Sequence, residues 1–528
     1  MSLRFTSLKE NYGESGQTKR VVGANGIPRE KKQLLPTFQR DGRVYMPTVR
    51  QLASRFPSTL FSQASTVTDL IPNIDYIDHM CLRVDLTVTV APVAVVSTNY
   101  WFRQLDLKTA GNGNIIQTQY ADTMQANFLN RVPLSAEKAL FKTACIESDT
   151  NGKYGVAKLL PVGTHTFYIP LLTTVFENFG GLFLNDLDGF LQLSVTTPST
   201  IIASGSGSVS AAISYIVEGA HLTAGDIAVY RNRYNLAAAE AQFLQPILTP
   251  FYGVQLTAGA NNHLKLDNVN GLCAFQMLMV RPVGQKDQNA AYAQWQLLNI
   301  GDSNGAAIDL VDNGGQSIWG NGQAVPTRYM RQHLSVEHFP NGWASEKPAY
   351  FINYCEKINQ ALRGKVEGAR AFDSSKGDQI RLVLPPAPVQ EVQTVTFSIT
   401  PQATGFYSFS YKGEQSAQIA GNASTATMQS TLQAMKSFAS KYITVTCSAA
   451  ASAGASFTIT FTDPEGELTG DLVQLVCHDG MVASASTART TAAIPGLASG
   501  SYDVSVYSYV YQVARYNGRV LSSHLLTN

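Results

Sequence analysis

Alternation of apolar and polar residues is the dominant pattern along this chain, and it predicts strands. Residues 81–90 (CLRVDLTVTV) alternate with a period of two, which is typical of a strand with one buried face. Residues 272–280 (LCAFQMLMV) are apolar nearly throughout, as in a strand covered on both faces. We therefore expect an all-β protein with few helices.

Three strand-like segments occur twice in the same order, each time as strand, irregular connector, strand, loop and strand. The segments span residues 166–171, 187–195 and 212–217 in the first copy, and 349–354, 376–384 and 504–511 in the second. A short Ser/Gly loop at 204–210 joins the last two strands of the first copy, whereas residues 385–503 separate them in the second. A repeated β-fold decorated in one copy is typical of a protein that builds a surface.

Helical patterns are confined to a few segments. Residues 231–244 contain the run AAAEAQFL, which has strong helix formers and no breaker, and they end before Pro246. This pattern predicts a helix that connects the two copies. Shorter helices are predicted at residues 120–129 and 135–142.

Residues 391–488 carry a pattern of their own. They follow a proline-rich segment at 385–388 and end near a small-residue stretch at 483–501, both of which we interpret as linkers. Between these linkers, several predicted strands flank a helix that begins after the candidate N-cap Ser424. The pattern predicts an independent α+β or β-sandwich domain inserted into the second copy.

These patterns divide the chain into six parts. They are a basic N-terminal arm (1–45), a first β-domain (46–224), a connecting helix (225–245), the first part of a second β-domain (246–390), the inserted domain (391–488), and the closing strand with the C-terminal tail (489–528).

The composition favours a protein with large covered surfaces. The chain has 528 residues, enough for two large domains, and 45% of them are hydrophobic. Only 15% are charged, well below the usual quarter. Since exposed faces normally carry charge, much of this surface is expected to be covered by other subunits. A secreted or extracellular β-protein is the competing interpretation.

Charge is unevenly distributed along a chain whose formal net charge is +1. Residues 1–50 hold ten Lys and Arg against four acidic residues, and residues 391–488 hold three Lys against seven acidic residues. The basic end is either a solvated arm or an arm that faces an anionic layer, lipid or nucleic acid.

The six cysteines are spread singly, with no CxxC pair. Cys447 and Cys477 fall within the predicted insertion, and a bridge between them stays an open alternative. The N-terminus lacks the pattern of a secretory signal, and no apolar run reaches the length of a membrane span. We expect synthesis in the cytoplasm and no transmembrane segment.

No group of residues has the spacing that catalysis or metal binding requires. His333 and His338 are the only close pair of histidines, and their spacing is poor for chelation. Acidic clusters at 75–79 and 186–188 fall at turns, where Asp favours local backbone bonding. We expect no enzyme and no catalytic, cofactor-binding or metal-binding residues. The candidates that we set aside are Asp75, Asp78, His79, Asp186, Asp188, the sequon at Asn422, and the Arg–aromatic segments at 328–331 and 511–516.

The echoed segments resemble the double jelly-roll major capsid proteins of tailless icosahedral viruses. The resemblance is carried by FYIPL at 167–171 with GLFLNDLDGFLQL at 181–193, by FDSSKGDQIRL at 372–382, and by YDVSVYSYVYQVARYNG at 502–518. Separately, FYSFSYKG at 406–413, NASTATMQSTLQAM at 422–435 and FTITF at 457–461 look like a small module of bacterial and phage surface proteins, which suggests a bacterial virus.

The resemblance implies two tandem jelly-roll β-barrels, with the insertion in the second. It also implies a homotrimer that presents six similar wedges and tiles as a pseudo-hexagon in an icosahedral capsid. The implied partners are neighbouring capsomers, minor capsid or penton proteins, a lipid membrane or genome at the arm, and the host surface at the insertion. The alternative is a β-sandwich spike protein that binds a receptor or a glycan.

Overall fold

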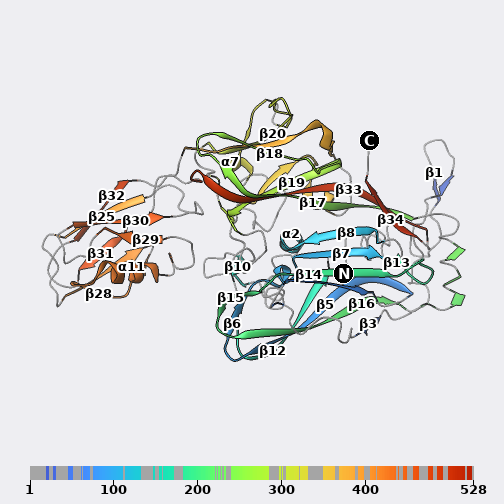
Figure 1. Ribbon diagram of the computed structural model, residues 1–528, viewed down its shortest axis with the longest axis horizontal. Helices are drawn as coiled ribbons and strands as arrows, with labels where there is room; N and C mark the ends of the chain where they lie inside the picture. The colour runs from blue at the N-terminus through green and yellow to red at the C-terminus, as the bar shows by residue number, and fades with distance from the viewer. Residues whose placement is uncertain are drawn as a thin grey trace.

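The computed structural model describes residues 61–131, 147–171, 182–232, 239–284, 297–330, 349–386, 391–448, 456–462, 474–479, 485–491 and 497–525, apart from short gaps, and three short strands before residue 51. The two barrels lie against each other, so that their main sheets form a stack of layers, and the insertion projects from one end of the stack (Figure 1).

The first barrel consists of two antiparallel sheets. One has the order β12-β5-β16-β3 and the other the order β4-β14-β7-β8. Their strands are β3 (Met46–Arg50), β4 (Ser65–Leu70), β5 (Tyr76–Thr89), β7 (Gln104–Thr109), β8 (Ile115–Tyr120), β12 (Gly163–Leu171), β14 (Leu191–Thr197) and β16 (Ser208–Ala220).

The second barrel repeats this plan. Its sheets have the orders β17-β33-β19-β22 and β18-β24-β20-β21. Their strands are β17 (Ala239–Leu256), β18 (Asn261–Lys265), β19 (Gly271–Pro282), β20 (Ala307–Val311), β21 (Val325–Pro326), β22 (Tyr350–Asn353), β24 (Gln379–Val383) and β33 (Gly500–Tyr516).

The two barrels correspond strand for strand in chain order. In each, the first strand pairs with the last, the last with the third, and the third with the sixth; the second, seventh, fourth and fifth form the other sheet. This arrangement is the two-sheet jelly roll. The three segments that recur in the sequence are the last three strands of each barrel, so the predicted repeat and the predicted double jelly roll are confirmed.

The hydrophobic pattern explains where each strand lies. In β5, the alternate residues Leu82, Val84 and Leu86 are buried, which confirms a strand with one covered face. In β19, burial is continuous from Cys273 to Arg281. The prediction that this strand is covered on both faces is therefore confirmed.

The predicted connecting helix over 231–244, within the domain boundary 225–245, is wrong in its second half. Residues 239–244 begin β17, which pairs with β33 along nearly its whole length, from Ala239 with Tyr516 to Leu256 with Gly500. Helix propensity is a weak preference, and the long ladder and the burial of Phe243 and Leu244 outweigh it. Residues 231–232 are helical, and 233–238 lie outside the described residues.

Helix α2 (Ala121–Arg131) follows β8 directly and confirms the helix predicted at 120–129, whereas 135–142 lies outside the described residues. The smaller elements of the barrels and arm are β1 (Arg20–Val22), β2 (Pro28–Glu30), β6 (Val93–Val95), η2 (Thr98–Tyr100), β9 (Glu147–Ser148), β10 (Tyr154–Val156), β11 (Lys158–Leu160), β13 (Leu182–Phe183), β15 (Ile202–Gly205), α7 (Thr327–Tyr329), α10 (Ile358–Ala361), β23 (Arg370–Phe372), η5 (Ser374–Lys376) and β34 (Leu521–Leu525).

The insertion lies between β24 and β33 and has its own core. One sheet has the order β29-β30-β25-β32, and in the other β26 pairs with β27, β28 and β31; within the described residues these strands pair only with one another. The Ser424 hydroxyl accepts a hydrogen bond from the Thr427 amide, which confirms the predicted N-cap. The elements are β25 (Glu391–Phe397), β26 (Phe406–Tyr411), β27 (Glu414–Gln415), β28 (Ile419–Ala420), α11 (Thr425–Gln433), β29 (Thr444–Cys447), β30 (Ser456–Thr462), β31 (Val476–Asp479) and β32 (Ala485–Thr491).

The sequence predicts that the small-residue stretch at 483–501 is a linker, but parts of this stretch form strands. Strand β32 (Ala485–Thr491) pairs with β25 inside the insertion, and β33 already begins at Gly500. The end predicted for the insertion, residue 488, therefore falls inside a strand. Small residues such as Ala485 and Ser486 can pair there because the partner strand supplies the hydrogen bonds. The two cysteines of the insertion, Cys447 and Cys477, are in the thiol form.

Candidate functional site

Two of the acidic residues that could suggest hydrolysis, Asp75 and Asp186, connect separate segments of the chain. The Asp75 carboxylate accepts hydrogen bonds from the Asn185 side chain at 2.6 Å and from the Leu222 amide at 2.7 Å. Asp186 is paired with Arg231, whose guanidinium nitrogens lie 2.5 and 2.6 Å from its oxygens. Both carboxylates join segments that are 45 to 147 positions apart in the sequence, so the local backbone bonding expected at these turns is not what the structure shows.

The remaining candidates are not gathered into a site. Asp78 and His79 lie inside strand β5, so the turn predicted for them is wrong, because the strand begins at Tyr76. Asp188 lies before β14, while His333 and His338 lie outside the described residues. No group of His, Cys, Asp or Glu in the described part of the chain could hold a metal ion. Among the same residues, no helix is long and apolar enough to span a membrane.

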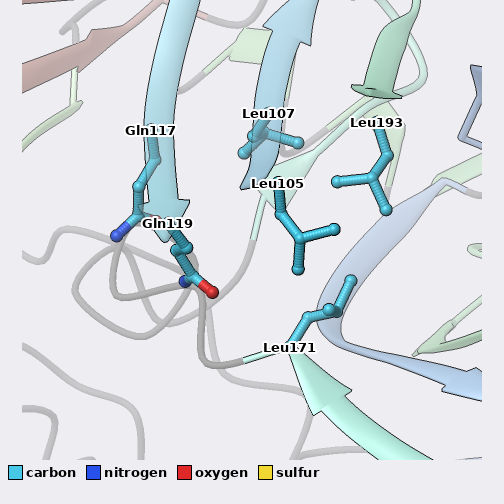
Figure 2. Close-up of a pocket in the computed structure, with 6 residues that line it drawn as sticks. All are labelled: Leu105, Leu107, Gln117, Gln119, Leu171 and Leu193. Atoms are coloured by element: carbon cyan, nitrogen blue, oxygen red, sulfur yellow. The ribbon is translucent and has the colours of Figure 1, made fainter. Parts of the chain in front are cut away.

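A small pocket opens within the first barrel, and its lining does not suggest catalysis. Figure 2 shows four leucines, from β7, β12 and β14, on one side of the pocket and the two glutamines of β8 on the other. The lining residues are Leu105, Leu107, Gln117, Gln119, Leu171 and Leu193. The accessible space is about 10 Å³, which is room for one water molecule.

The junction between the barrels is an extensive buried contact. The second barrel's sheet that contains β19 and β33 is covered on both faces. Val504, Val506 and Val510 of β33 belong to the core of the second barrel, whereas Tyr507 and Tyr509 of the same strand belong to the core of the first. The apolar core of the first barrel therefore extends onto the outer face of this sheet, while the second barrel keeps a separate core on the inner face.

Aromatic and sulfur-containing side chains fill the junction. Phe275 of β19 stacks on Tyr509 with ring centroids 4.2 Å apart, and Met277 and Met279 are fully buried beside it. Burial, and secondarily the charge of Asp122, raises the pKa of Tyr509 well above its usual range. Such contacts bury a large apolar area in the junction, but they do little to fix the relative orientation of the two barrels.

A buried charged cluster crosses the same junction. Asp122, at the start of α2, accepts a hydrogen bond from Arg281 Nη2 at 2.6 Å, and the two side chains are 0% and 1% exposed. Its other oxygen accepts from the Tyr507 hydroxyl at 2.7 Å. The Tyr100 hydroxyl of the first barrel donates to Asp122 at 2.9 Å. One carboxylate thus joins groups from both barrels.

A second polar contact crosses the junction beside this cluster. The Thr118 amide of β8 donates to the Gln245 side-chain oxygen of β17 at 3.0 Å, and both residues are buried. The nearby Tyr120 ring lies 5.7 Å from the Tyr507 ring. Burial and the charge of Asp106 raise the pKa of Tyr120 to about 12.

Sequence reasoning did not find this cluster. Asp122 and Arg281 are separated by 159 positions, and neither lies in a motif. The one available signal was an arginine placed directly after the apolar run 272–280, inside a strand predicted to be covered on both faces. A buried arginine requires a buried acidic partner, but the pattern does not say which.

One end of each barrel is elaborated differently. In the first barrel, β6, β11 and β15 form a small sheet from the three connections at that end. Val90 beside this sheet has a φ of 72° and is 87% exposed, which is unusual for a β-branched residue. The insertion of the second barrel occupies the connection that corresponds to β15, between the seventh and eighth strands.

No protein-family model matches the sequence, and no curated protein matches it. Among solved structures, the quasi-atomic model of the PBCV-1 virus capsid is similar to this chain at a TM-score of 0.52 and 12% identity, over 92% of this chain and 98% of that chain. PBCV-1 VP54, in the crystal structure fitted into a reconstruction of the virophage Sputnik, gives the same values, 0.52, 12%, 92% and 98%. The mavirus major capsid protein matches at 0.41 and 9%, over 95% and 96%.

The similarity to the PBCV-1 structures concerns the fold. It places this chain among the all-β double jelly-roll proteins, in agreement with its two matching barrels. The neighbour named as a virus capsid is a structural protein, and its chain is covered nearly end to end.

Proposed function

We propose that this chain is the major capsid protein of an icosahedral virus and acts as a structural protein, with no enzymatic activity. The observation that carries the proposal is the pair of matching jelly rolls, packed so that the core of the first extends onto the sheet of the second. The match to the PBCV-1 capsid over 92% of the chain supports it. Function in such a protein is shape and association, so no catalytic residue is needed.

We further propose that three chains associate as a homotrimer. Two similar barrels in each of three chains give six similar wedges around a threefold axis, which can tile like a hexagon. The low charged content of 15% fits large contacts between subunits and between neighbouring capsomers. Minor capsid and penton proteins are the further partners that a closed shell requires. The protein is made in the host cytoplasm and resides in the virion.

The two ends of the molecule are proposed to face opposite sides of the shell. Strand β1 of the arm and the insertion lie toward opposite ends of the longest axis (Figure 1). The arm, residues 1–45, is basic, so we place it inside, against a lipid membrane or the genome. The acidic insertion faces outward, toward the host surface. We propose a bacterial host only because the sequence of 393–480 looks like a small module of bacterial and phage surface proteins. The structural neighbours named above include no bacterial virus.

Light scattering after size-exclusion chromatography tests the trimer. We expect a compact particle of three times the 57.1 kDa chain mass. A monomer or a fibre would contradict the trimer and favour the alternative, a β-sandwich spike protein that binds a receptor or a glycan. Protease nicking of intact particles tests the polarity: cleavage within the insertion is expected, and cleavage within the arm would contradict the inner placement.

The insertion is proposed to be an independent domain, now drawn as 391–491 to include β32. Because it has its own apolar core and enters at a loop, closing that loop with a short Gly/Ser segment costs little. The shortened chain should still form trimers, while surface protrusions disappear in electron micrographs. Loss of folding in this variant would show that the insertion is part of the second barrel.

A further inference from the structure

The cluster around Asp122 has the properties of a device that fixes orientation. Its Asp122 and Arg281 side chains are 0% and 1% exposed, and their contact is 2.6 Å. A buried ion pair often contributes little net stability compared with apolar residues of the same volume, because desolvation opposes the attraction between the charges. Stability alone therefore does not account for a charged pair inside a largely apolar junction.

The apolar part of the junction cannot by itself fix the relative orientation of the two barrels. Phe275, Met277 and Met279 bury area, but apolar contact is non-directional and methionine side chains are adaptable. A small rotation of one barrel could be absorbed by repacking of these side chains. The same rotation would separate the Asp122 carboxylate from Arg281 and Tyr507 and leave buried polar groups unpaired, which is unfavourable.

The groups that donate hydrogen bonds to the Asp122 carboxylate come from both barrels. Tyr100 belongs to the first barrel, as does Asp122, whereas Arg281 and Tyr507 come from two adjacent strands of the second. The Thr118 to Gln245 hydrogen bond adds a second fixed point at 3.0 Å, on the strand that leads into α2. Two polar contacts at separate points restrict rotation as well as translation.

We propose that the Asp122–Arg281–Tyr507 cluster sets the angle between the two barrels, and with it the angle at which one chain presents its two wedges to its neighbours. The consequence for assembly rests on the proposed capsid function. The orientation itself is a property of the single chain, so it can be tested whether or not trimers form.

The test compares two charge-removing double variants of the full chain. Asp122→Leu/Arg281→Met removes the pair across the junction. The matched control, Asp309→Leu/Arg381→Met, removes a pair of the same length, 2.6 Å, that joins β20 to β24 inside the second barrel. Spin labels on unnatural amino acids at Tyr168 of β12 and Lys265 of β18, both exposed, report the distance between the barrels by double electron–electron resonance. Dilution with unlabelled protein confines the measurement to one chain.

We expect one narrow distance distribution in the wild-type chain and in the control, and a shifted or broadened one in the junction variant. The melting temperature of the junction variant should stay within a few degrees of wild type. An unchanged distribution in the junction variant would overturn the proposal, and so would equal broadening in the control.

A milder variant keeps the test valid if the junction variant does not fold. Tyr507→Phe removes one hydrogen bond to Asp122 and leaves the ion pair in place. It should broaden the distribution to a smaller degree, while Tyr502→Phe, at the exposed end of the same strand, should not. Identical distributions for the two phenylalanine variants would contradict the proposal. A correct orientation in a chain that forms no trimer would instead contradict the proposed function alone.

Discussion

The third strands of the two barrels occupy the same place in the same fold, yet they are buried differently. In β5 of the first barrel, buried Leu82 and Val84 alternate with the partly exposed Arg83 and Asp85, which form an ion pair at 3.1 Å. In β19 of the second barrel, every residue from Cys273 to Arg281 is buried. The difference arises because the first barrel covers the outer face of the second barrel's sheet.

This comparison shows that the hydrophobic pattern of a strand reports its neighbours outside the barrel as well as inside. A jelly roll that stands alone needs only one apolar face per strand. The second barrel departs from that rule where it meets the first, and the departure includes one fully buried charge, Arg281. The sequence of the second barrel therefore indicates the junction through a strand, β19, that is buried on both faces.

The largest expected effect comes from placing a charge on each of these two strands. Met277→Lys puts an ammonium group at a fully buried position of β19 without an acidic partner, and we expect a loss of more than about 4 kcal/mol, or no folding. Thr87→Lys, on the partly exposed face of β5, should change the free energy of unfolding by less than about 0.5 kcal/mol. Urea denaturation of both variants measures the contrast. Similar losses for both would show that the two strands are equally covered.

The next effect concerns the charged cluster itself. Asp122→Leu leaves Arg281 buried without this carboxylate, and we expect a loss of about 3–5 kcal/mol in the free energy of unfolding. Adding Arg281→Met should restore most of it, because the unfavourable charge is then removed as well. A double variant as unstable as the single one in thermal or urea unfolding would show that the pair itself stabilises the fold.

A smaller effect is expected where the barrels differ at the connection before the last strand. In the first barrel, Gly207 packs against the connection between β5 and β6. A Cβ atom at this position would sit 2.0 Å from the Ala91 backbone oxygen. Gly207→Ala should therefore destabilise the protein by about 1–3 kcal/mol through overpacking. Gly500→Ala, at the start of the corresponding strand in the second barrel, meets nothing closer than 3.8 Å and serves as the control. Equal melting temperatures for the two variants would contradict this assignment.

The smallest effect is a stabilisation at the same end of the first barrel. Val90 has a φ of 72°, a left-handed conformation that disfavours β-branched residues, and its side chain is 87% exposed. Val90→Asn should raise the stability by about 1 kcal/mol, since asparagine tolerates this conformation and little packing is lost. Differential scanning calorimetry would detect the rise in melting temperature. A fall would mean that the valine side chain makes a contact that holds the turn.

The sequence was most informative where strands follow one another locally. The last three strands of each barrel, the doubly covered β19 and the N-cap Ser424 were all predictable, because each depends on a short periodic pattern or a local hydrogen bond. Two predictions failed at 231–244 and 483–501, where alanine-rich and small-residue segments become strands. In both places the partner strand decides the structure, and it lies far away in the sequence.

The junction could not be predicted for the same reason. Asp122 and Arg281 are brought together only when two complete barrels have formed and packed. A strand covered on both faces indicates that something packs on it, but the pattern of β19 does not identify the first barrel as the partner. The orientation of the barrels therefore had to come from the structure.

Single-particle cryo-electron microscopy of the purified protein tests directly whether this chain builds a capsid. We expect particles with threefold symmetry in which six barrels, two from each chain, form a pseudo-hexagonal ring with three insertions projecting from one face. A monomer, or an oligomer in which the barrels do not form such a ring, would contradict the assignment of this chain as a capsid-building protein.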